Sequence, residues 1–446
     1  MRGRRIRRAG LACASALLLG LGAACSENTD QGQIPWTGPT ESGPLPSPAG
    51  SGGSVASPNT IAAPADNVAE VTVDFGLPGI PYLDGLFATV TVCVPGTSNC
   101  QNIDHVLVDT GSSGLRLLRS VLTLALPPAT NDGGVALAEC SQFVSGFAWG
   151  PLATADFRIA GEQASNLIIQ VINEQAFPVP NDCTGTGVNT AQDLGCNGIL
   201  GIGSFLQDCG SDCEAPLGAR STNPGTYYAC SSTTRGGCQA TVIPVAKQVS
   251  NPVALFSQDN NGTIIELPAI PANGARQVAG ALVFGIGTRE NNGLDQATVM
   301  PLSSQAGTFL TSYPPNGTRS MAFVDSGSNA IYFLDSGSTR IPTCPGDYSV
   351  FYCPTSTLNL SAMNQDDSGL VSVTVNFSVA SAMTLLASGT NCAFNNVGGP
   401  SVDPSEGTAS MGVYFDWGLP FHFGRNVFNA LAGQSTPAGP GPFVAF

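Results

Sequence analysis

The sequence predicts an all-β protein built from two lobes. Short runs rich in β-branched residues alternate with Gly, Pro and Asn turns, which is typical of strands joined by tight connections. No long stretch has the hydrophobic period of an amphipathic helix. A chain of 446 residues is long enough for two domains or lobes. We expect the lobes at residues 66–255 and 256–446.

The expected strands are spread over both halves of the chain. They cover residues 71–75, 86–92, 106–108, 157–159, 167–172, 281–284, 321–324 and 370–375. Hydrophobic residues make up 42% of the chain, and this content excludes a chain that is disordered throughout.

The first 24 residues have the pattern of a signal peptide. Five arginines precede an apolar core at residues 9–22, which is followed by small residues and Cys25. Cys25 in this position resembles the lipidated cysteine of a bacterial lipobox. Ordinary signal-peptidase cleavage near Ala24 is the alternative.

Residues 25–65 are rich in Pro, Gly, Ser and Thr, a composition typical of a tether. We therefore expect an exported protein of the cell envelope, anchored in the outer membrane or at the cell surface by a lipid on Cys25. Without that lipid it would be periplasmic or secreted. No later stretch reaches 18 uninterrupted apolar residues, so we expect membrane contact only through the anchor.

The net charge excludes a nucleic-acid partner. Without the five arginines of residues 1–24, 11 basic residues face 31 acidic ones, which leaves a net charge of about −20. Residues 26–115 contain no Lys or Arg at all.

The cysteines fit an oxidising compartment. Of 14, Cys13 lies in the signal peptide and Cys25 is the lipidation candidate, so twelve remain for up to six disulfides, whose pairing the sequence leaves open. The pairs close enough for small loops are Cys93/Cys100, Cys209/Cys213, Cys230/Cys238 and Cys344/Cys353. With only two histidines and no Cys-x-x-Cys pair, we expect no metal and no other cofactor.

Two aspartates in matching contexts carry the functional hypothesis. Asp109 and Asp325 each follow an apolar run, precede a hydroxyl residue, Gly and Ser, and lead into a second apolar run. The supporting residues of the two motifs are Thr110, Gly111, Ser112, Ser326, Gly327 and Ser328.

Two such loops face to face would hold two carboxyl groups a few Å apart. Gly permits close backbone approach, and the hydroxyl after each Asp can bond to the opposite loop. Carboxylates this close cannot both ionise, so they share a proton. One can then act as a general base on water while the other polarises a carbonyl.

The tripeptide Asp-Ser/Thr-Gly alone is weakly specific, because it also occurs at Asp335 and Asp367. Asp367 has no apolar strand before it. Asp335 is followed by Pro342 where the second apolar strand should run, so Asp325 is preferred. A plain interpretation also remains, in which both preferred aspartates are turn residues without chemistry.

The motif pair resembles that of pepsin-like aspartic proteases, and the chain is similar to a bacterial family of exported proteins, DUF3443. Residues 197–203, Asn-Gly-Ile-Leu-Gly-Ile-Gly, resemble the motif that follows the first Asp in a pepsin-like lobe, and residues 143–161 resemble the flap hairpin and its return strand. Residues 280–285 and 417–421 resemble an entry strand and the closing motif. The resemblance covers residues 66–446 and implies a bilobal double β-barrel with an interlobe cleft.

The resemblance also implies a flap that closes over the substrate. The substrate-binding candidates are Arg116, Phe143, Ser145, Gly146 and Trp149. Phe143 stands where the pepsin-like proteases usually have Tyr, and Arg116 stands where they have the Trp that bonds that Tyr. Both partners of that one hydrogen bond are therefore replaced. A packing role is equally open for Trp149. The tether lacks Lys and Arg, so we do not expect activation by release of a basic pro-segment.

Other chemistries fit less well. A serine nucleophile at Ser112 or Ser113 would need His105 or His422 as its base. A glycosidase would need its two carboxyl groups farther apart than a proton-sharing pair.

We therefore expect a monomeric aspartic endopeptidase that hydrolyses extended peptides or proteins with a water activated between Asp109 and Asp325. The alternative is a catalytically inactive binding or inhibitor protein of the same fold at the cell envelope.

Overall fold

The structure is a computed structural model that describes residues 59–401 and 414–446, except residues 145, 174, 219, 220 and 235. The predicted signal peptide, the tether up to residue 58, Cys25 and Ser145 lie outside the described residues. Their predicted roles stay predictions.

Strands dominate the described chain. In its first part they are β1 (Val68–Leu77), β2 (Ile80–Cys93), β3 (Cys100–Asp109), β4 (Ser113–Leu118), β5 (Ala136–Phe143), β6 (Gly146–Ile159), β7 (Glu162–Ile172), β8 (Gly198–Ile202), β9 (Tyr227–Cys230) and β10 (Cys238–Ala240). In its second part they are β11 (Gly262–Leu267), β12 (Val278–Phe284), β13 (Val299–Pro301), β14 (Phe309–Tyr313), β15 (Thr318–Val324), β16 (Ile331–Phe333), β17 (Leu358–Gln365), β18 (Ser372–Val379), β19 (Gly398–Gly399), β20 (Tyr414–Trp417), β21 (Arg425–Ala430), β22 (Ser435–Thr436), β23 (Gly439–Pro440) and β24 (Phe443–Ala445). The α-helices are short: α1 (Ala191–Leu194), α2 (Ser336–Thr339) and α3 (Ala382–Leu386).

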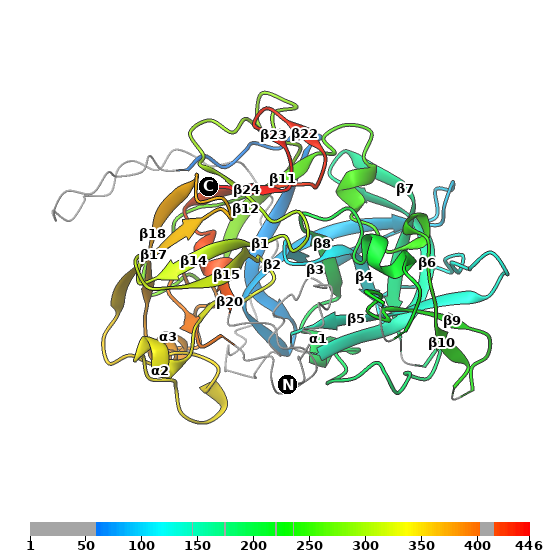
Figure 1. Cartoon of the computed structure of the whole chain (residues 1–446), viewed down its shortest axis with the longest axis horizontal. Coiled ribbons are helices and arrows are strands. Elements are labelled where there is room, and N and C mark those ends of the chain that lie inside the picture. The colour runs from blue at the N-terminus through cyan, green and yellow to red at the C-terminus, as the bar shows by residue number, and fades with distance from the viewer. Residues whose placement is uncertain (1–58, 145, 174, 219–220, 235, 402–413) are drawn as a thin grey trace, which may run out of the picture.

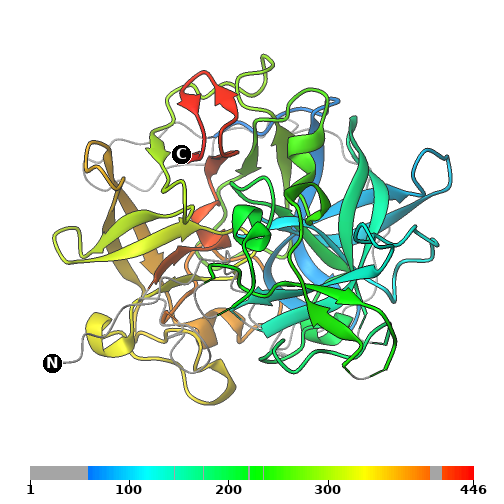
Figure 2. The ribbon, with the colours of Figure 1, turned by 45° about the vertical axis from the view of Figure 1, so that its right-hand side comes forward.

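The strands form two large sheets that give the molecule two halves. One sheet of 15 strands has the order β10-β9-β5-β6-β7-β4-β8-β3-β2-β1-β12-β11-β21-β24-β13, and one of seven has the order β18-β17-β14-β15-β20-β16-β19. In Figure 1, β4 to β7 lie on the right, β14, β15, β17, β18 and β20 on the left, and β1, β2, β11 and β12 between them. Figure 2 shows the same division from a second direction. The predicted all-β, two-lobed fold is confirmed.

The long sheet joins the two halves through β1. Val71 of β1 pairs with Ala88 of β2 on one side and with Gly280 of β12 on the other. A strand from the start of the chain is therefore hydrogen-bonded to a strand from its second half. The exact lobe boundary expected at residues 255/256 stays a prediction.

The apolar core consists of several clusters, of which the largest contains residues from both halves of the chain. The larger cluster includes Val71 and Val108, and the second cluster, around β15 and β20, includes Phe415 and Trp417, whose ring centroids lie 4.5 Å apart. Burial of such side chains is the main favourable contribution to folding. Most of the β-branched runs read from the sequence become buried strands, whereas the run expected at residues 370–375 overlaps β18, which is only partly buried.

Five disulfides form among the described residues. They are Cys93–Cys100, Cys140–Cys183, Cys209–Cys213, Cys230–Cys238 and Cys344–Cys353. All four short-loop pairs occur, and the five bonds lie within the predicted upper limit of six. Cys196 and Cys392 are buried outside these bonds, with Cys196 Sγ against the Gly198 carbonyl and Cys392 Sγ against the Arg276 carbonyl. Disulfides in this number fit an oxidising compartment.

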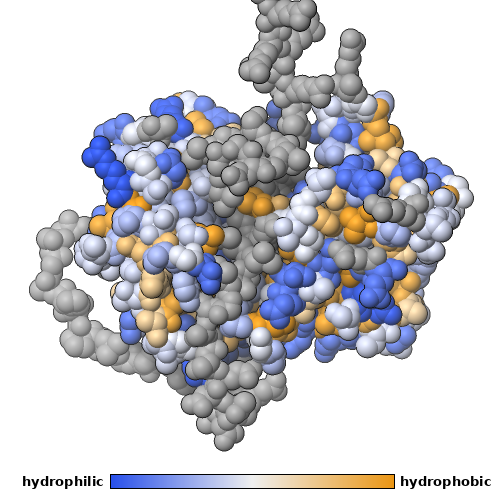
Figure 3. Space-filling model, turned by 90° about the horizontal axis from the view of Figure 1, so that it is seen from below, coloured by the Kyte–Doolittle hydropathy of each residue, from blue (hydrophilic) through white to orange (hydrophobic). Residues whose placement is uncertain are grey.

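Apolar side chains on the described surface are dispersed. Figure 3 shows hydrophobic and hydrophilic residues side by side on both halves. The exposed large apolar residues are Val144, Leu217, Val242, Leu255, Leu370 and Met383. Among the described residues, no helix combines the length and the apolar character needed to cross a membrane. The expected monomer and lipid anchor stay predictions.

Buried glutamates predict that the protein is more stable in mild acid than at neutral pH. Burial raises the pKa of Glu266 to about 7, although the Ala62 N–H acts against this shift, and burial together with Asp259 raises the pKa of Glu162 to about 7. The ordinary glutamate pKa is 4.5. Between these values the folded state holds protons that the unfolded state releases, so the free energy of unfolding falls as the pH rises. We expect a higher melting temperature at pH 5 than at pH 7.5.

Glu266→Gln is the matched variant, because it cannot titrate. Its melting temperature should depend less steeply on pH over the same interval. A wild-type protein that becomes more stable from pH 5 to pH 7.5 would contradict this account.

Candidate active site

The two motif aspartates lie at equivalent positions of a repeated three-strand unit. In the first half, β8 runs parallel to β3 and antiparallel to β4, with Asp109 opposite Gly201. In the second half, β20 runs parallel to β15 and antiparallel to β16, with Val324 opposite Trp417. Asp109 and Asp325 therefore each stand at the end of a buried strand, where the loop to the next strand begins.

The hydroxyl residues after the two aspartates bind the loops to each other. Thr110 Oγ1 donates to the Val324 carbonyl (3.1 Å) and accepts from the Ser326 N–H (2.9 Å). Reciprocally, Ser326 Oγ donates to the Val108 carbonyl (2.7 Å) and accepts from the Thr110 N–H (3.1 Å). Four hydrogen bonds thus fix the distance and orientation of the loops. They form the cross-loop contact predicted from the sequence pattern.

Glycine allows the two carboxyl groups to approach. A Cβ on Gly111 would lie 2.7 Å from Asp325 Cγ, and one on Gly327 would lie 2.8 Å from Asp109 Oδ1. Both distances are far shorter than carbon and oxygen atoms tolerate. Each glycine N–H also donates to its own Asp, from Gly111 to Asp109 and from Gly327 to Asp325, both at 2.8 Å.

The carboxyl groups of Asp109 and Asp325 are hydrogen-bonded to each other and completely buried. Burial raises the pKa of Asp325 well above its usual range, and the neighbouring charges of Asp109 and Asp416 raise it further. The Gly327 N–H opposes this shift. Two buried carboxyl groups in contact repel each other when both are ionised, which favours the protonated form of Asp325.

The serines of the two motifs contact the carboxyl groups differently. Ser112 Oγ donates to Asp109 Oδ2. Ser328 Oγ lies 3.0 Å from Asp325 Oδ2 and 2.6 Å from Oδ2 of a further buried carboxyl group, Asp416. Asp416 lies outside the Asp-Ser/Thr-Gly tripeptides, so the sequence pattern does not single it out.

The predicted flap is a β-hairpin of β5 and β6, in which Phe143 pairs with Gly146. Phe143 is 7% exposed and Trp149 is fully buried. The Trp149 indole N–H donates to the Phe177 carbonyl (2.7 Å), and its ring packs edge-on against Tyr228. This placement favours packing, one of the two roles that the sequence left open for Trp149.

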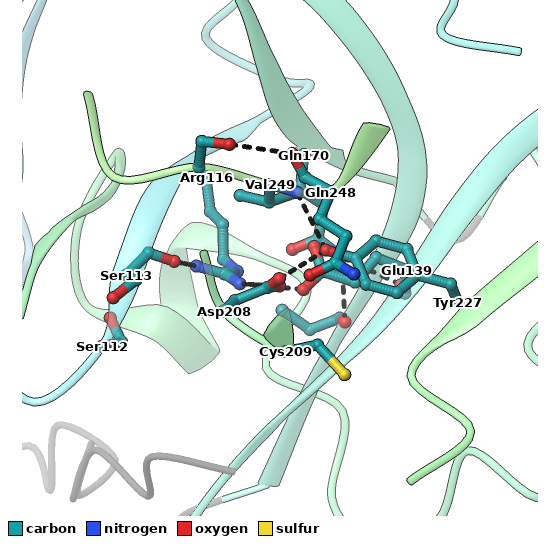
Figure 4. A network of polar contacts seen from close by, with 12 residues as sticks. Ser112, Ser113, Arg116, Glu139, Gln170, Asp208, Cys209, Tyr227, Gln248 and Val249 are labelled. Carbon is teal, nitrogen blue, oxygen red and sulfur yellow. Dashed lines mark hydrogen bonds and ion pairs between the residues drawn. The ribbon is translucent and has the colours of Figure 1, made fainter. Parts of the chain in front are cut away.

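Arg116 lies in a buried ionic network behind the first loop (Figure 4). Its Nη2 donates to Glu139 Oε1 (2.8 Å) and Asp208 Oδ2 (3.0 Å), and its Nη1 donates to the Ser113 carbonyl (2.8 Å). Tyr227 donates to the other oxygen of Asp208. Burial and the adjacent Glu139 charge raise the pKa of Asp208 well above its usual range. Arg116 therefore ties the flap strand to the loop at residue 208, which the sequence did not indicate.

A cavity of about 90 Å³ connects this network with the motif. Its lining includes Ser112, Arg116, Glu139, Phe143 and Asp208. The predicted substrate-binding residues Arg116 and Phe143 thus share one cavity with Ser112, whereas Gly146 and Trp149 are not part of its lining.

The other sequence candidates have surroundings of a different kind. Asp335 is exposed and caps α2 by accepting from the Ser338 N–H. Asp367 lies in the exposed turn between β17 and β18. His105 contacts Asp74 and Asp104, and His422 is buried, with a pKa that burial lowers to about 3.

The fold and site define a two-lobed all-β protein with paired Asp loops at its centre. A profile of the family described as "Protein of unknown function (DUF3443)" matches residues 63–446, so the chain belongs to this family. A search of curated proteins finds no match. The solved structure of an aspartic proteinase from Irpex lacteus is similar, with 16% sequence identity, a TM-score of 0.47, and coverage of 85% of this chain and 96% of that chain.

Removing one hydroxyl of the cross-loop contact should destabilise the protein measurably. Ser326→Ala leaves the Val108 carbonyl and the Thr110 N–H without these partners, which should lower the free energy of unfolding by about 1–3 kcal/mol. Ser336, which follows the exposed Asp335, is the matched control. Ser336→Ala should change the free energy of unfolding by less than about 0.5 kcal/mol. Denaturant unfolding of both variants checks this. Equal losses would show that the cross-loop bonds add no special stability.

Proposed function

We propose that this protein is an aspartic endopeptidase that uses Asp109 and Asp325 as its catalytic pair. The single observation that carries the proposal is the contact between two buried carboxyl groups on cross-bonded loops. Holding two acids together out of water is costly. Their one evident chemical use is to keep one group protonated beside one that is ionised.

The geometry supports a mechanism with two proton transfers and no covalent intermediate. Asp109, whose carboxylate receives donors from Gly111 and Ser112, removes a proton from a water molecule as that water attacks the peptide carbonyl carbon. Asp325, protonated, donates to the carbonyl oxygen and gives up its proton as the diol forms. Asp109 then passes its proton to the leaving amine, the C–N bond breaks, and Asp325 recovers a proton from the diol.

The substrate proposed is an extended peptide. The β5–β6 hairpin ends at Phe143 and Gly146, and the cavity lined by Phe143 and Ser112 offers room for a side chain beside the first motif. We further propose that the enzyme is exported and held at the cell envelope by a lipid on Cys25, with the Pro/Gly/Ser-rich segment as a tether.

A binding protein without turnover is the second candidate. Phe143 lacks a hydroxyl, and the Arg116 guanidinium is bonded to Glu139, Asp208 and the Ser113 carbonyl. Neither side chain therefore supplies the flap hydrogen bond that the resembling proteases use to clamp a peptide. A cleavage assay separates the two candidates.

Cleavage should depend on Asp109 and Asp325. We expect the purified protein to cleave a mixture of denatured proteins at some pH between 3 and 7. Asp109→Asn and Asp325→Asn should each lower the rate at least about 1,000-fold, because either change removes the acid–base pair. Peptide products identified by mass spectrometry provide the measurement.

Asp335→Asn is the matched control, since it changes the same residue type in the same tripeptide on the surface. It should cleave as the wild type does. Loss of cleavage only in Asp335→Asn would reject the assigned pair. No cleavage by folded wild-type protein at any pH would favour the binding protein.

A further inference from the structure

A third buried carboxyl group, Asp416, lies beside the proposed catalytic pair. It stands on β20, is 4% exposed, and is linked to Asp325 through the Ser328 hydroxyl. The negative charge of Asp416 also raises the pKa of Asp325 directly. The mechanism proposed above makes no use of it.

The repeated unit shows that the fold does not require an acid at this position. Asp416 lies opposite Phe323 of β15 and Tyr332 of β16. In the first half the corresponding residue is Ile199, which lies opposite Leu107 of β3 and Arg116 of β4. Ile199 is fully buried. An apolar side chain therefore fills this position in one half, and an acid replaces it in the other.

The acid at position 416 changes the hydrogen bonding of Ser328 in the second half. A serine has one hydroxyl proton, so it can donate to one carboxyl group at a time. Ser112 donates to Asp109. Ser328 lies closer to Asp416 (2.6 Å) than to Asp325 (3.0 Å), and donation to Asp416 is the shorter bond. Donation from Ser112 stabilises the ionised form of Asp109, whereas Asp416 competes with Asp325 for the donor of the second loop.

We propose that Asp416 is a positioning residue that assigns the shared proton of the pair to Asp325. It does so by drawing the Ser328 hydroxyl away from Asp325 and by placing a negative charge beside it when ionised. This inference deepens the proposed function, on which it rests, because it fixes Asp109 as the base and Asp325 as the acid. The proton stays within the site, and no other reactant is needed.

Of the titratable groups next to Asp416, the phenols stay neutral and the carboxyl groups carry the charge. Tyr332 and Tyr82 face the same site, and burial raises the pKa of both phenols well above the usual range, so both stay neutral. Burial raises the pKa of Asp416 well above its usual range; the Ser328 hydroxyl opposes this shift, and the Asp109 charge adds to it. Asp84 is the other acid near Tyr332, and burial likewise raises its pKa. Where Asp416 is ionised, its negative charge favours the protonated form of Asp325.

The test removes the charge of Asp416 and follows Asp325. In the full chain with ¹³C-labelled aspartate, the Asp325 carboxyl resonance is assigned by its loss in Asp325→Asn and titrated from pH 3 to pH 9. Asp416→Asn should lower the midpoint of Asp325 by about one pH unit or more, as expected for a charge a few Å away. The alkaline limb of the pH profile of cleavage should move down by a similar amount. Asp416→Glu should restore most of both shifts.

Two further variants keep the test decisive. Asp416→Ile copies the residue of the first half and serves if the Asn variant does not fold, and Asp335→Asn controls for removal of a surface charge. An Asp325 midpoint unchanged in a folded Asp416 variant would overturn the proposal. If the wild type does not cleave, the titration still decides the role of Asp416, while the absent cleavage counts only against the proposed endopeptidase.

Discussion

The reciprocal hydrogen bonds between the two Asp loops are the constraint on which the rest of the site depends. Thr110 and Ser326 each donate to a carbonyl of the opposite half and accept an N–H from it. These bonds bring two carboxyl groups together that would repel each other in water. Because β1 joins the halves in one sheet, the folding of both halves stabilises this contact.

The repeated unit provides the same backbone twice and different chemistry in each half. Beside the first loop, Arg116 forms a buried ionic network with Glu139 and Asp208. Beside the second loop, Tyr332 stands at the position equivalent to Arg116, and Asp416 at the position equivalent to Ile199. The repeated backbone therefore holds the two acids in contact. The asymmetric part sets which acid keeps the proton and how the flap strand is anchored.

Much of this arrangement is predictable from the sequence, because it is encoded locally. The apolar run, Asp, hydroxyl residue and Gly are contiguous at Asp109 and Asp325, and the β-branched runs mark the strands. The partners of Arg116 were not predictable, since Glu139 and Asp208 are 23 and 92 residues away. Asp416 could have been found by aligning the residues before Gly418 with those before Gly201, but the strand register that justifies this alignment is a tertiary property. The number of cysteines set only an upper limit on the disulfides, because a count of cysteines carries no distances.

The central claim is that Asp109 and Asp325 share one proton, and carboxyl titration of Asp325 with and without an ionisable Asp109 tests it most directly. In the wild type, the Asp325 resonance should titrate well above the ordinary aspartate value of 3.8. In Asp109→Asn its midpoint should fall, because the repelling charge is replaced by an amide that can donate a hydrogen bond. A midpoint near the ordinary value in the wild type, unchanged by the substitution, would show two independent carboxyl groups and contradict the account.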